Sequence, residues 1–262
     1  MRSTAKQKGL LILGTSGFSY EHWRDVFYPP GTPQSRWLEV YAEHFSAVEL
    51  NVTFYRLPRR ETFEGWARRT PSDFRFVVKG SRTITHYRRL HDASAPLDAL
   101  LTASDGLGEK LACILWQLPP QLPADPARLD EFCETLAERT AARGGGGDLR
   151  HAFEFRDAGW FSDPVLAVLR RYGHALVFAD PPREREPREL TADWAYLRFH
   201  HGRRSDGGYE DAEIEPYARL AAHASDEGKD VFAFFNNDMG GWAPKNAERF
   251  RALVADQHAL AR

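Results

Sequence analysis

Short runs of β-branched and aromatic residues recur along the chain, and each is followed by a turn and then by a stretch of helical periodicity. The predicted strands are Leu10–Leu13, Ala47–Asn51, Asp73–Lys79, Leu111–Leu118, His151–Arg156, His174–Asp180, Trp194–His200 and Asp230–Asn236. The predicted helices lie near Ser35–Phe45, Arg60–Arg69, Pro96–Leu101, Pro126–Arg139, Asp163–Tyr172, Glu213–Ala224 and Pro244–Val254. The segment after the sixth strand is short and broken by proline. Such alternation predicts a parallel sheet, and eight units predict a closed (β/α)8 TIM barrel with eight parallel strands.

No linker or change of composition divides the chain, and no segment closely repeats another. We therefore expect one TIM-barrel domain over residues 10–262, preceded by a flexible segment over residues 1–9. The run Gly144–Gly147 lacks the Lys-Ser/Thr pair of a phosphate-binding loop, so it is interpreted as a flexible connection on the lower face of the barrel.

The composition excludes several classes of protein. A chain of 262 residues that is 42% hydrophobic can bury a large core, which argues against a disordered or fibrous protein. The net charge of -2 gives no overall basic field, so any anion site must be local. Cys113 and Cys133 match no metal or disulfide spacing, which fits a reducing compartment. With no signal peptide and no apolar run near the roughly 20 residues of a membrane helix, we expect a cytoplasmic protein.

Polar residues occupy the ends of the predicted strands. Alternate strand residues point into a barrel, and the last inward positions form the floor of the active site. On the sixth strand, we assign Leu176, Phe178 and Asp180 to this inward set. Seven of the eight strands then end in a polar inward residue, which a hydrophobic core does not require. These residues are Asn51, Lys79, Gln117, Arg156, Asp180, His200 and Asn236.

Three charged residues, Glu49, Glu154 and Arg198, lie one inward step below the barrel mouth. Buried charges must be paired, because an isolated buried ion costs many kcal/mol. One interpretation is a structural ion-pair network, with Arg75 as a further partner. The other is that the two carboxylates are catalytic and that Arg198 binds the ligand.

The loops after the strands carry aromatic rings and arginines. Flat rings beside cations suit bases, sugars and other planar ligands, and arginine matches phosphate bidentately. We select Tyr55 and Trp160 as candidate ligand-binding rings, although such rings can also pack long loops onto the barrel. The rings are Phe18, Tyr20, Trp23, Phe54, Tyr55, His86, Tyr87, Trp160, Phe161, Tyr209 and Trp242, and the arginines are Arg56, Arg59, Arg60, Arg82, Arg88, Arg89, Arg203 and Arg204.

Several motifs resemble the YecE-like family, known as domain of unknown function 72. They include Gly14-Thr15-Ser16-Gly17-Phe18-Ser19-Tyr20, Val48-Glu49-Leu50-Asn51, Leu115-Trp116-Gln117-Leu118-Pro119-Pro120, Glu154-Phe155-Arg156 and Phe234-Phe235-Asn236-Asn237-Asp238. The resemblance covers nearly the whole chain and implies a (β/α)8 barrel, but it implies no activity. Within it, we select Asn237 as a further ligand-binding candidate.

The suggested likeness of this family to endonuclease-IV-type barrels offers a phosphodiester hypothesis by analogy of fold alone. Too few ligands stand at the strand ends for several zinc ions, and Lys79, Arg156 and Arg198 would repel a metal cluster. We predict no metal, nicotinamide or flavin, and a single divalent ion on His200 and Asp180 is the alternative.

The first functional hypothesis is a hydrolase of phosphoester or glycosidic bonds whose substrate is phosphorylated or resembles nucleic acid. Arg156 would clamp the anion, and Glu49 or Asp180 would be general acid or base with a raised pKa. His200 is the alternative proton carrier, while Lys79 would neutralise the anion or form a Schiff base. The second hypothesis is a non-catalytic nucleic-acid-binding module. A metabolite sensor or scaffold stays open. The expected partner at the mouth is thus an anionic, ring-containing small molecule or a nucleic acid.

Overall fold

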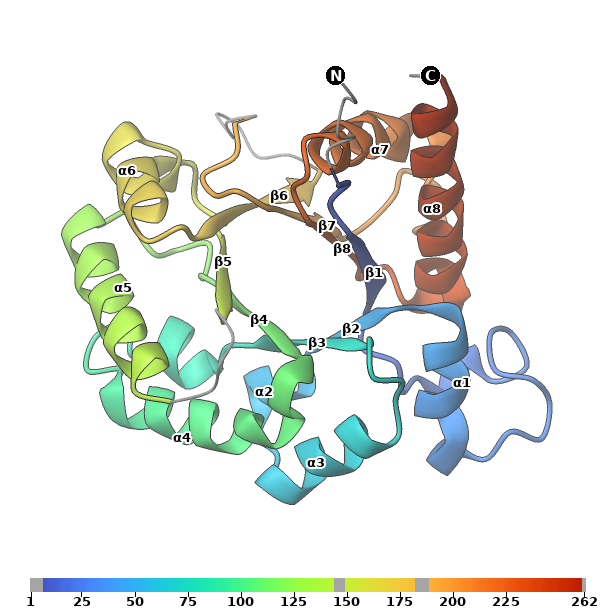
Figure 1. The fold of residues 1–262 in the computed structure, drawn as a ribbon, viewed down its shortest axis with the longest axis horizontal. Coiled ribbons are helices and arrows are strands. Elements are labelled where there is room, and N and C mark those ends of the chain that lie inside the picture. The colour runs from blue at the N-terminus through green and yellow to red at the C-terminus, as the bar shows by residue number, and fades with distance from the viewer. Residues whose placement is uncertain (1–6, 144–148, 182–188, 261–262) are drawn as a thin grey trace, which may run out of the picture.

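The computed structural model describes residues 7–143, 149–181 and 189–260, and eight parallel strands close a barrel in chain order (Figure 1). This confirms the predicted (β/α)8 TIM barrel. The strands are β1 (Leu11–Ser16), β2 (Ala47–Leu50), β3 (Arg75–Lys79), β4 (Leu111–Gln117), β5 (Arg150–Glu154), β6 (Ala175–Asp180), β7 (Ala195–Phe199) and β8 (Val231–Phe235).

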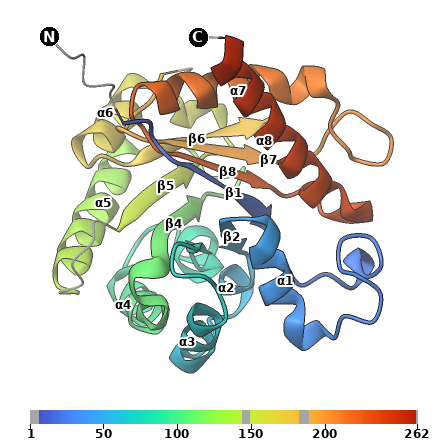
Figure 2. The same cartoon turned by 45° about the vertical axis from the view of Figure 1, so that its right-hand side comes forward.

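Helices surround the barrel (Figure 2). Their apolar side chains pack against the strands. They are α1 (Trp37–His44), α2 (Val52–Tyr55), α3 (Arg60–Arg68), α4 (Ser94–Ser104), α5 (Pro126–Ala141), α6 (Asp163–Arg171), α7 (Asp211–Asp226) and α8 (Trp242–Leu260). Short helical turns lie in the connections: Glu21–Trp23, Gln34–Arg36, Thr83–Tyr87, Asp105–Lys110, Ala158–Trp160 and Met239–Gly241. Between β6 and β7, the described residues form no helix, in line with the proline-broken segment of the sequence.

The first strand is longer than its hydrophobic run. It continues through Gly14 to Ser16, which lie opposite Ala47 and Glu49 of β2. Gly14 makes this pairing possible, because a Cβ there would lie 1.9 Å from the carbonyl oxygen of Ala47. The Gly-Thr-Ser sequence has the composition of a turn, so its pattern did not extend the predicted strand.

The interior consists of two apolar clusters. The outer cluster lies between the strands and the helices. The inner cluster fills the amino-terminal part of the lumen and consists of Ile12, Ala47, Val77, Cys113, Leu115, Ala152, Ala175, Val177, Trp194, Tyr196, Phe232 and Phe234. This packed layer leaves the polar residues at the carboxyl ends of the strands as the floor of the barrel mouth.

The inward assignment on β6 is wrong. Leu176 and Phe178 belong to the outer cluster, while Ala175 and Val177 face the lumen. The register confirms this, because Ala179 pairs with the inward Arg198 and Asp180 with the outward Phe199. The strand is apolar on both faces, so its pattern does not reveal its parity. Small inward residues on β6 leave room for the large side chains of β7.

Of the two segments predicted to be flexible, one lies partly and the other wholly outside the described residues. These are residues 1–6 of the amino-terminal segment and the run Gly144–Gly147. Among the residues that are described, no helix combines the length and the apolarity that crossing a membrane requires.

Candidate functional site

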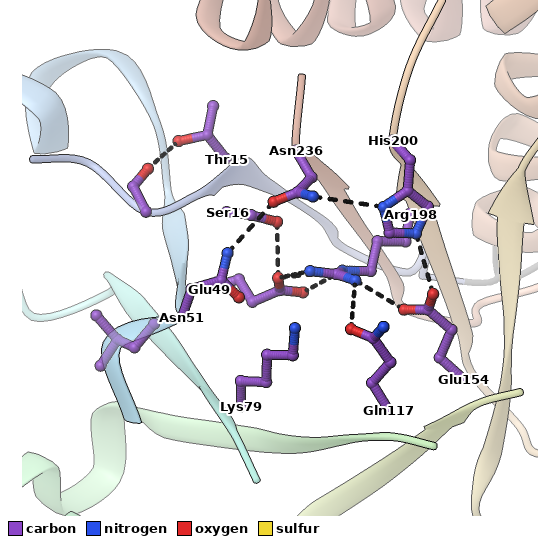
Figure 3. A network of polar contacts seen from close by, with 12 residues as sticks. Thr15, Ser16, Glu49, Asn51, Lys79, Gln117, Glu154, Arg198, His200 and Asn236 are labelled. Atoms are coloured by element: carbon purple, nitrogen blue, oxygen red, sulfur yellow. Dashed lines mark hydrogen bonds and ion pairs between the residues drawn. The ribbon is translucent and has the colours of Figure 1, made fainter. Parts of the chain in front are cut away.

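The floor of the barrel mouth centres on Arg198 of β7, which joins two carboxylates (Figure 3). Its Nη2 donates to Glu49 Oε1 at 2.7 Å, and its Nη1 donates to Glu154 Oε2 at 2.8 Å. Both carboxylates are fully buried. Gln117 also accepts from Arg198 Nη1, at 3.3 Å. The predicted ion-pair network therefore exists, but Arg75 donates instead to the backbone carbonyls of Ser72 and Phe74.

Burial alone would raise the pKa of both carboxyl groups, but Arg198 outweighs it together with the other cations and hydrogen-bond donors beside each carboxylate. The pKa of Glu49 is lowered, and that of Glu154 lies well below its ordinary value. Both groups are therefore ionised at neutral pH. The expectation that Glu49 has a raised pKa is wrong, because a guanidinium inside the lumen stabilises its charged form.

Lys79 ends β3, and its side chain points toward the Glu49–Arg198 pair (Figure 3). Its Nζ lies 4.6 Å from the centroid of the Phe54 ring. Within the described part of the chain, this ammonium group makes no hydrogen bond or ion pair at contact distance. Burial and then the charge of Arg198 lower its pKa to about 8. At pH 7 the floor thus presents a cation that no carboxylate of the described residues contacts.

His200 follows β7 and contacts Glu154. Its Nε2 lies 3.0 Å from Glu154 Oε1, and the same oxygen lies 2.5 Å from Arg156 Nη2. Burial lowers the pKa of the imidazole, against the opposing effect of Glu154. His200 is therefore neutral at pH 7, and the carboxylate orients its ring.

A chain of hydrogen bonds leads from Glu154 through His200 to two amides. His200 Nε2 lies 3.0 Å from both Glu154 Oε1, which only accepts, and Arg156 Nη2, which only donates. Because the amide nitrogen of Asn236 faces Nδ1 as a donor, we assign the proton to Nε2, which leaves Nδ1 as an acceptor. Nδ1 then accepts from Asn236 Nδ2 at 3.4 Å, and Asn236 Oδ1 accepts from Asn51 Nδ2 at 3.3 Å. The side-chain oxygen of Asn51, Oδ1, is buried without a partner among the described residues.

Three candidates lie away from the floor. The Asp180 side chain faces outward, where Tyr209 and Tyr217 hydrogen-bond to its carboxyl group. Trp160 is fully buried, stacks on Phe155 with ring centroids 4.9 Å apart, and donates to the carbonyl of Leu122. It packs a loop onto the barrel, which is the alternative the sequence left open, and the ligand-facing position predicted for it is wrong.

Asn237 also has a structural position. It donates to the carbonyl of Gly207 at 3.1 Å and to Asn246 Oδ1 at 2.9 Å. It therefore joins the loops after β7 and β8 behind the floor. The prediction that it faces a ligand is wrong, because the inward position belongs to its neighbour Asn236.

Two residues of the floor were not selected from the sequence. Ser16 Oγ donates to Glu49 Oε1 at 2.6 Å, and Tyr196 OH donates to Glu49 Oε2 at 2.6 Å. Tyr196 has the same parity as Arg198, which could have identified it. Ser16 was missed because β1 was predicted to end at Leu13. Ser16 thus supplies a polar inward end for β1, while β6 lacks one.

No group of three or more His, Cys, Asp or Glu side chains in residues 7–143, 149–181 and 189–260 could hold a metal ion. The alternative of one divalent ion on His200 and Asp180 is wrong, because their side chains lie on opposite faces of the sheet.

An exposed cluster of rings lies on the loops after β2 and β3. The guanidinium of Arg82 lies 5.7 Å from the Tyr55 ring and 5.5 Å from the Tyr87 ring. Tyr55 and Tyr87 are 66% and 67% exposed, so their faces are open to solvent. We call these three residues the Tyr-Arg-Tyr cluster.

Fold and site together define a (β/α)8 barrel protein whose mouth has a charged, hydrogen-bonded floor. The family of proteins of unknown function DUF72 matches residues 12–262, and the chain belongs to this family. The UPF0759 protein YunF from Bacillus subtilis is 28% identical, with 94% of this chain and 95% of YunF covered. The UPF0759 protein YecE from Escherichia coli is 35% identical over 38% of this chain and 37% of YecE.

Solved structures agree with the fold. A DUF72 family protein from Thermotoga maritima has 29% sequence identity and a TM-score of 0.80, and the match covers 94% of this chain and 99% of that one. A xylose isomerase-like TIM barrel protein from Mycobacterium smegmatis, solved with magnesium, has 12% identity, a TM-score of 0.53 and coverage of 87% and 91%. This second likeness concerns the fold alone.

Proposed function

We propose that the chain is a hydrolase that acts on a phosphorylated substrate at the barrel mouth. The observation that carries the proposal is the Lys79 ammonium group, which points toward the Glu49–Arg198 pair of the floor and lies near enough to Glu154 to feel its charge. In this proposal Lys79 binds the anionic oxygens of the phosphate and His200 is the general base. Arg198 and Glu49 support the floor from below.

The charges of the floor favour an anionic ligand. The charged groups that act on Lys79 are Arg198, Arg156, Glu49 and Glu154. Two guanidinium groups balance two carboxylates, and His200 is neutral, so the positive charge of Lys79 is left over. A bound phosphate would neutralise it, and partial burial strengthens that attraction.

The proposed step uses the lone pair of His200 Nδ1, which accepts from Asn236 in the structure. Water takes the place of Asn236 as the partner of Nδ1 and gives it a proton while the water oxygen bonds to phosphorus. The bond from phosphorus to the leaving alcohol oxygen breaks, and that oxygen keeps the electron pair. The proton on Nδ1 then passes to the leaving alcohol. Glu154 stabilises the transient imidazolium, as the carboxylate does in a Ser-His-Asp triad.

Phosphoester hydrolysis suits this floor better than glycosidic hydrolysis. Glycosidases use a carboxylic acid with a raised pKa as the proton donor. Glu49 and Glu154 have lowered pKa values, and Asp180, whose pKa burial raises, lies outside the lumen.

The test is a screen with p-nitrophenyl phosphate, bis-p-nitrophenyl phosphate and nucleoside monophosphates. We expect turnover of at least one compound, a loss of about 100-fold or more in His200→Gln, and weaker substrate binding in Lys79→Met. Asp180→Asn is the matched control, because it alters a buried carboxyl group outside the lumen. No turnover in the panel, or equal turnover in His200→Gln, would overturn the proposal.

The Tyr-Arg-Tyr cluster favours a second candidate, a non-catalytic nucleic-acid-binding module. Exposed rings beside a guanidinium can stack bases while the cation contacts phosphate. This candidate predicts binding of single-stranded oligonucleotides that weakens with salt and is lost in Arg82→Ala. Cleavage measured in the same samples separates the module from the enzyme, and salt-independent binding would count against both.

A further inference from the structure

A row of side chains leads from the floor to the Tyr-Arg-Tyr cluster, and Phe54 is its link. Lys79 Nζ lies 4.6 Å from the centroid of the Phe54 ring. The rings of Phe54 and Tyr55 meet edge to face, with centroids 5.0 Å apart. The Tyr55 ring is therefore no farther from Lys79 Nζ than these two distances added together, so one small ligand can contact both residues.

Tyr55 also lies on the side of the barrel mouth. The hydroxyl group of Tyr20 donates to the backbone carbonyl of Ser16, at the end of β1. Burial raises the pKa of this hydroxyl, and the charges that raise it further include those of Glu49 and Tyr55. Since Tyr55 and Glu49 of the floor act on the same group, the Tyr55 hydroxyl lies near the mouth rather than on the outer surface of the barrel.

Tyr55 and Tyr87 differ in exposure from the other rings of the protein. In the described part of the chain, every other Phe, Tyr or Trp side chain is buried or half-buried. Single apolar side chains on a surface need no explanation, but both exposed rings stand in one cluster beside the Arg82 guanidinium. Rings placed in this way can stack on a planar group of a ligand.

The two loops that carry the cluster are basic. Residues 51–60 and 79–91 contain six arginines and no Asp or Glu. Arg60 pairs with Glu64 of α3. Arg82 contacts two tyrosine rings and no carboxylate of the described residues. An anionic ligand is therefore attracted to this side of the mouth.

We propose that Tyr55 stacks on the base of a nucleoside monophosphate whose phosphate is bound by Lys79. This inference rests on the proposed function for the phosphate end of the ligand, and it deepens that function by naming the substrate class. A single ribose joins base and phosphate in such a compound, which suits the short path from Lys79 through Phe54 to Tyr55. Water supplies the new oxygen of inorganic phosphate, and the proton taken up by His200 passes to the ester oxygen of the departing nucleoside.

The test compares ligands that differ only in the base. The 5′-monophosphates of adenosine, guanosine, cytidine and uridine are titrated calorimetrically beside methyl ribofuranoside 5-phosphate, which has the sugar and the phosphate but no base. We expect at least one nucleotide to bind about tenfold or more tightly than the sugar phosphate, because a stacked base adds affinity. Equal binding of the nucleotides and the sugar phosphate, or no binding of any nucleotide, would overturn the inference.

Variants of the two exposed tyrosines assign the preference to one ring. Tyr55→Leu should lower the affinity for the nucleotide to that for the sugar phosphate, whereas Tyr55→Phe keeps the ring and should retain the preference. Tyr87→Leu is the matched control, because it removes the other exposed ring of the cluster and should leave the preference unchanged. A preference that survives in Tyr55→Leu would refute the inference, and circular dichroism checks that the variants fold.

A single-stranded oligonucleotide tests the length of the ligand. The inference expects it to bind no more tightly than the mononucleotide. An affinity more than about tenfold higher would overturn the inference in favour of the nucleic-acid-binding module.

The proposed function and this inference can fail separately. A preference for the nucleotide over the sugar phosphate, without turnover of any phosphoester, would remove the proposed function alone. Turnover of phosphoesters with equal KM for the nucleotide and the sugar phosphate would remove the inference alone. Lys79→Met should weaken binding of both phosphates by the same factor, and unchanged binding there would overturn the phosphate site that the two proposals share.

Discussion

Glu49 and Glu154 are both fully buried inside the barrel and both pair with Arg198, but their other partners differ. Glu49 accepts from Ser16 and Tyr196, two neutral hydroxyl groups of the lumen wall. Glu154 contacts His200 and Arg156, which lie nearer the mouth. Glu49 thus fixes the floor, while Glu154 couples the floor to a group that can carry a proton.

The largest expected effect tests the structural side of this comparison. Glu49→Gln removes the carboxylate that contacts Arg198 Nε and Nη2, which leaves a buried guanidinium short of a partner. Breaking a buried ion pair costs about 3–5 kcal/mol. We expect a loss of that size in the free energy of unfolding, measured by urea denaturation. Glu154→Gln is the matched variant, and a larger loss there than in Glu49→Gln would reverse the assigned roles.

The second prediction tests the functional side. Glu154→Gln removes the negative charge that orients the imidazole of His200 and would stabilise its protonated form. We expect kcat for the phosphoester found in the screen to fall about 100-fold or more, with KM little changed. Steady-state kinetics on the folded variant check this. A kcat within a few-fold of wild type would show that Glu154 is as purely structural as Glu49.

The third prediction concerns the cost of Lys79 to the fold. Its pKa is about 8 in the folded protein against 10.5 when unperturbed, so the folded state disfavours the proton. Between these two values the unfolded chain binds more protons than the native one, and the stability of the wild type should rise with pH. At pH 7 the penalty is on the order of 3 kcal/mol. Lys79→Met should lack this rise and be more stable than wild type at pH 7.

Thermal melts from pH 7 to pH 11 measure this difference. A Lys79→Met variant that is less stable than wild type at pH 7 would show that the ammonium group stabilises the fold. In that case the charge of the Lys79 ammonium group would already be balanced within the protein, without a ligand. Added phosphate should raise the melting temperature of the wild type and leave that of Lys79→Met unchanged.

The fourth prediction is a bell-shaped pH dependence of kcat/KM. Activity requires neutral His200, whose pKa lies below its ordinary 6.5 because of burial, so the acidic limb should fall below that value. It also requires protonated Lys79, so activity should decline above about pH 8. Lys79→Arg should remove the alkaline limb, because arginine stays charged. An unchanged alkaline limb in that variant would assign it to another group.

The strand pattern predicted the barrel, because alternation of strand and helix leaves few other folds open. It also predicted Glu49, Glu154 and Arg198 as one network, since their parity and depth follow from strands that alternate polar and apolar residues. Where a strand lacks this alternation, as in β6, parity could not be inferred and Asp180 was misplaced.

Properties that depend on contacts between several strands and loops could not be predicted from the sequence. The pKa of Glu49 depends on the distance to Arg198, about 150 positions further along the chain, and the pattern gave the pairing but not the sign of the shift. Trp160 and Asn237 lie in loops, whose paths follow from tertiary packing rather than from local periodicity. The unpartnered oxygen of Asn51 emerges only when the whole chain of donors is traced.

The smallest expected effect contrasts Asp180 with the two carboxylates of the floor. Burial raises the pKa of Asp180, and Tyr209 and Tyr217 oppose that rise by hydrogen-bonding to its ionised form. Because its pKa is raised in the folded protein, ionising Asp180 at neutral pH slightly disfavours folding. Asp180→Asn removes that penalty, so we expect the free energy of unfolding at neutral pH to rise by less than about 1 kcal/mol. Its phosphoester kinetics should equal those of the wild type, since the carboxyl group faces the helices. A loss of kcat comparable to that of Glu154→Gln would mean that the outer face of β6 influences the floor, and the contrast between inward and outward carboxylates would fail.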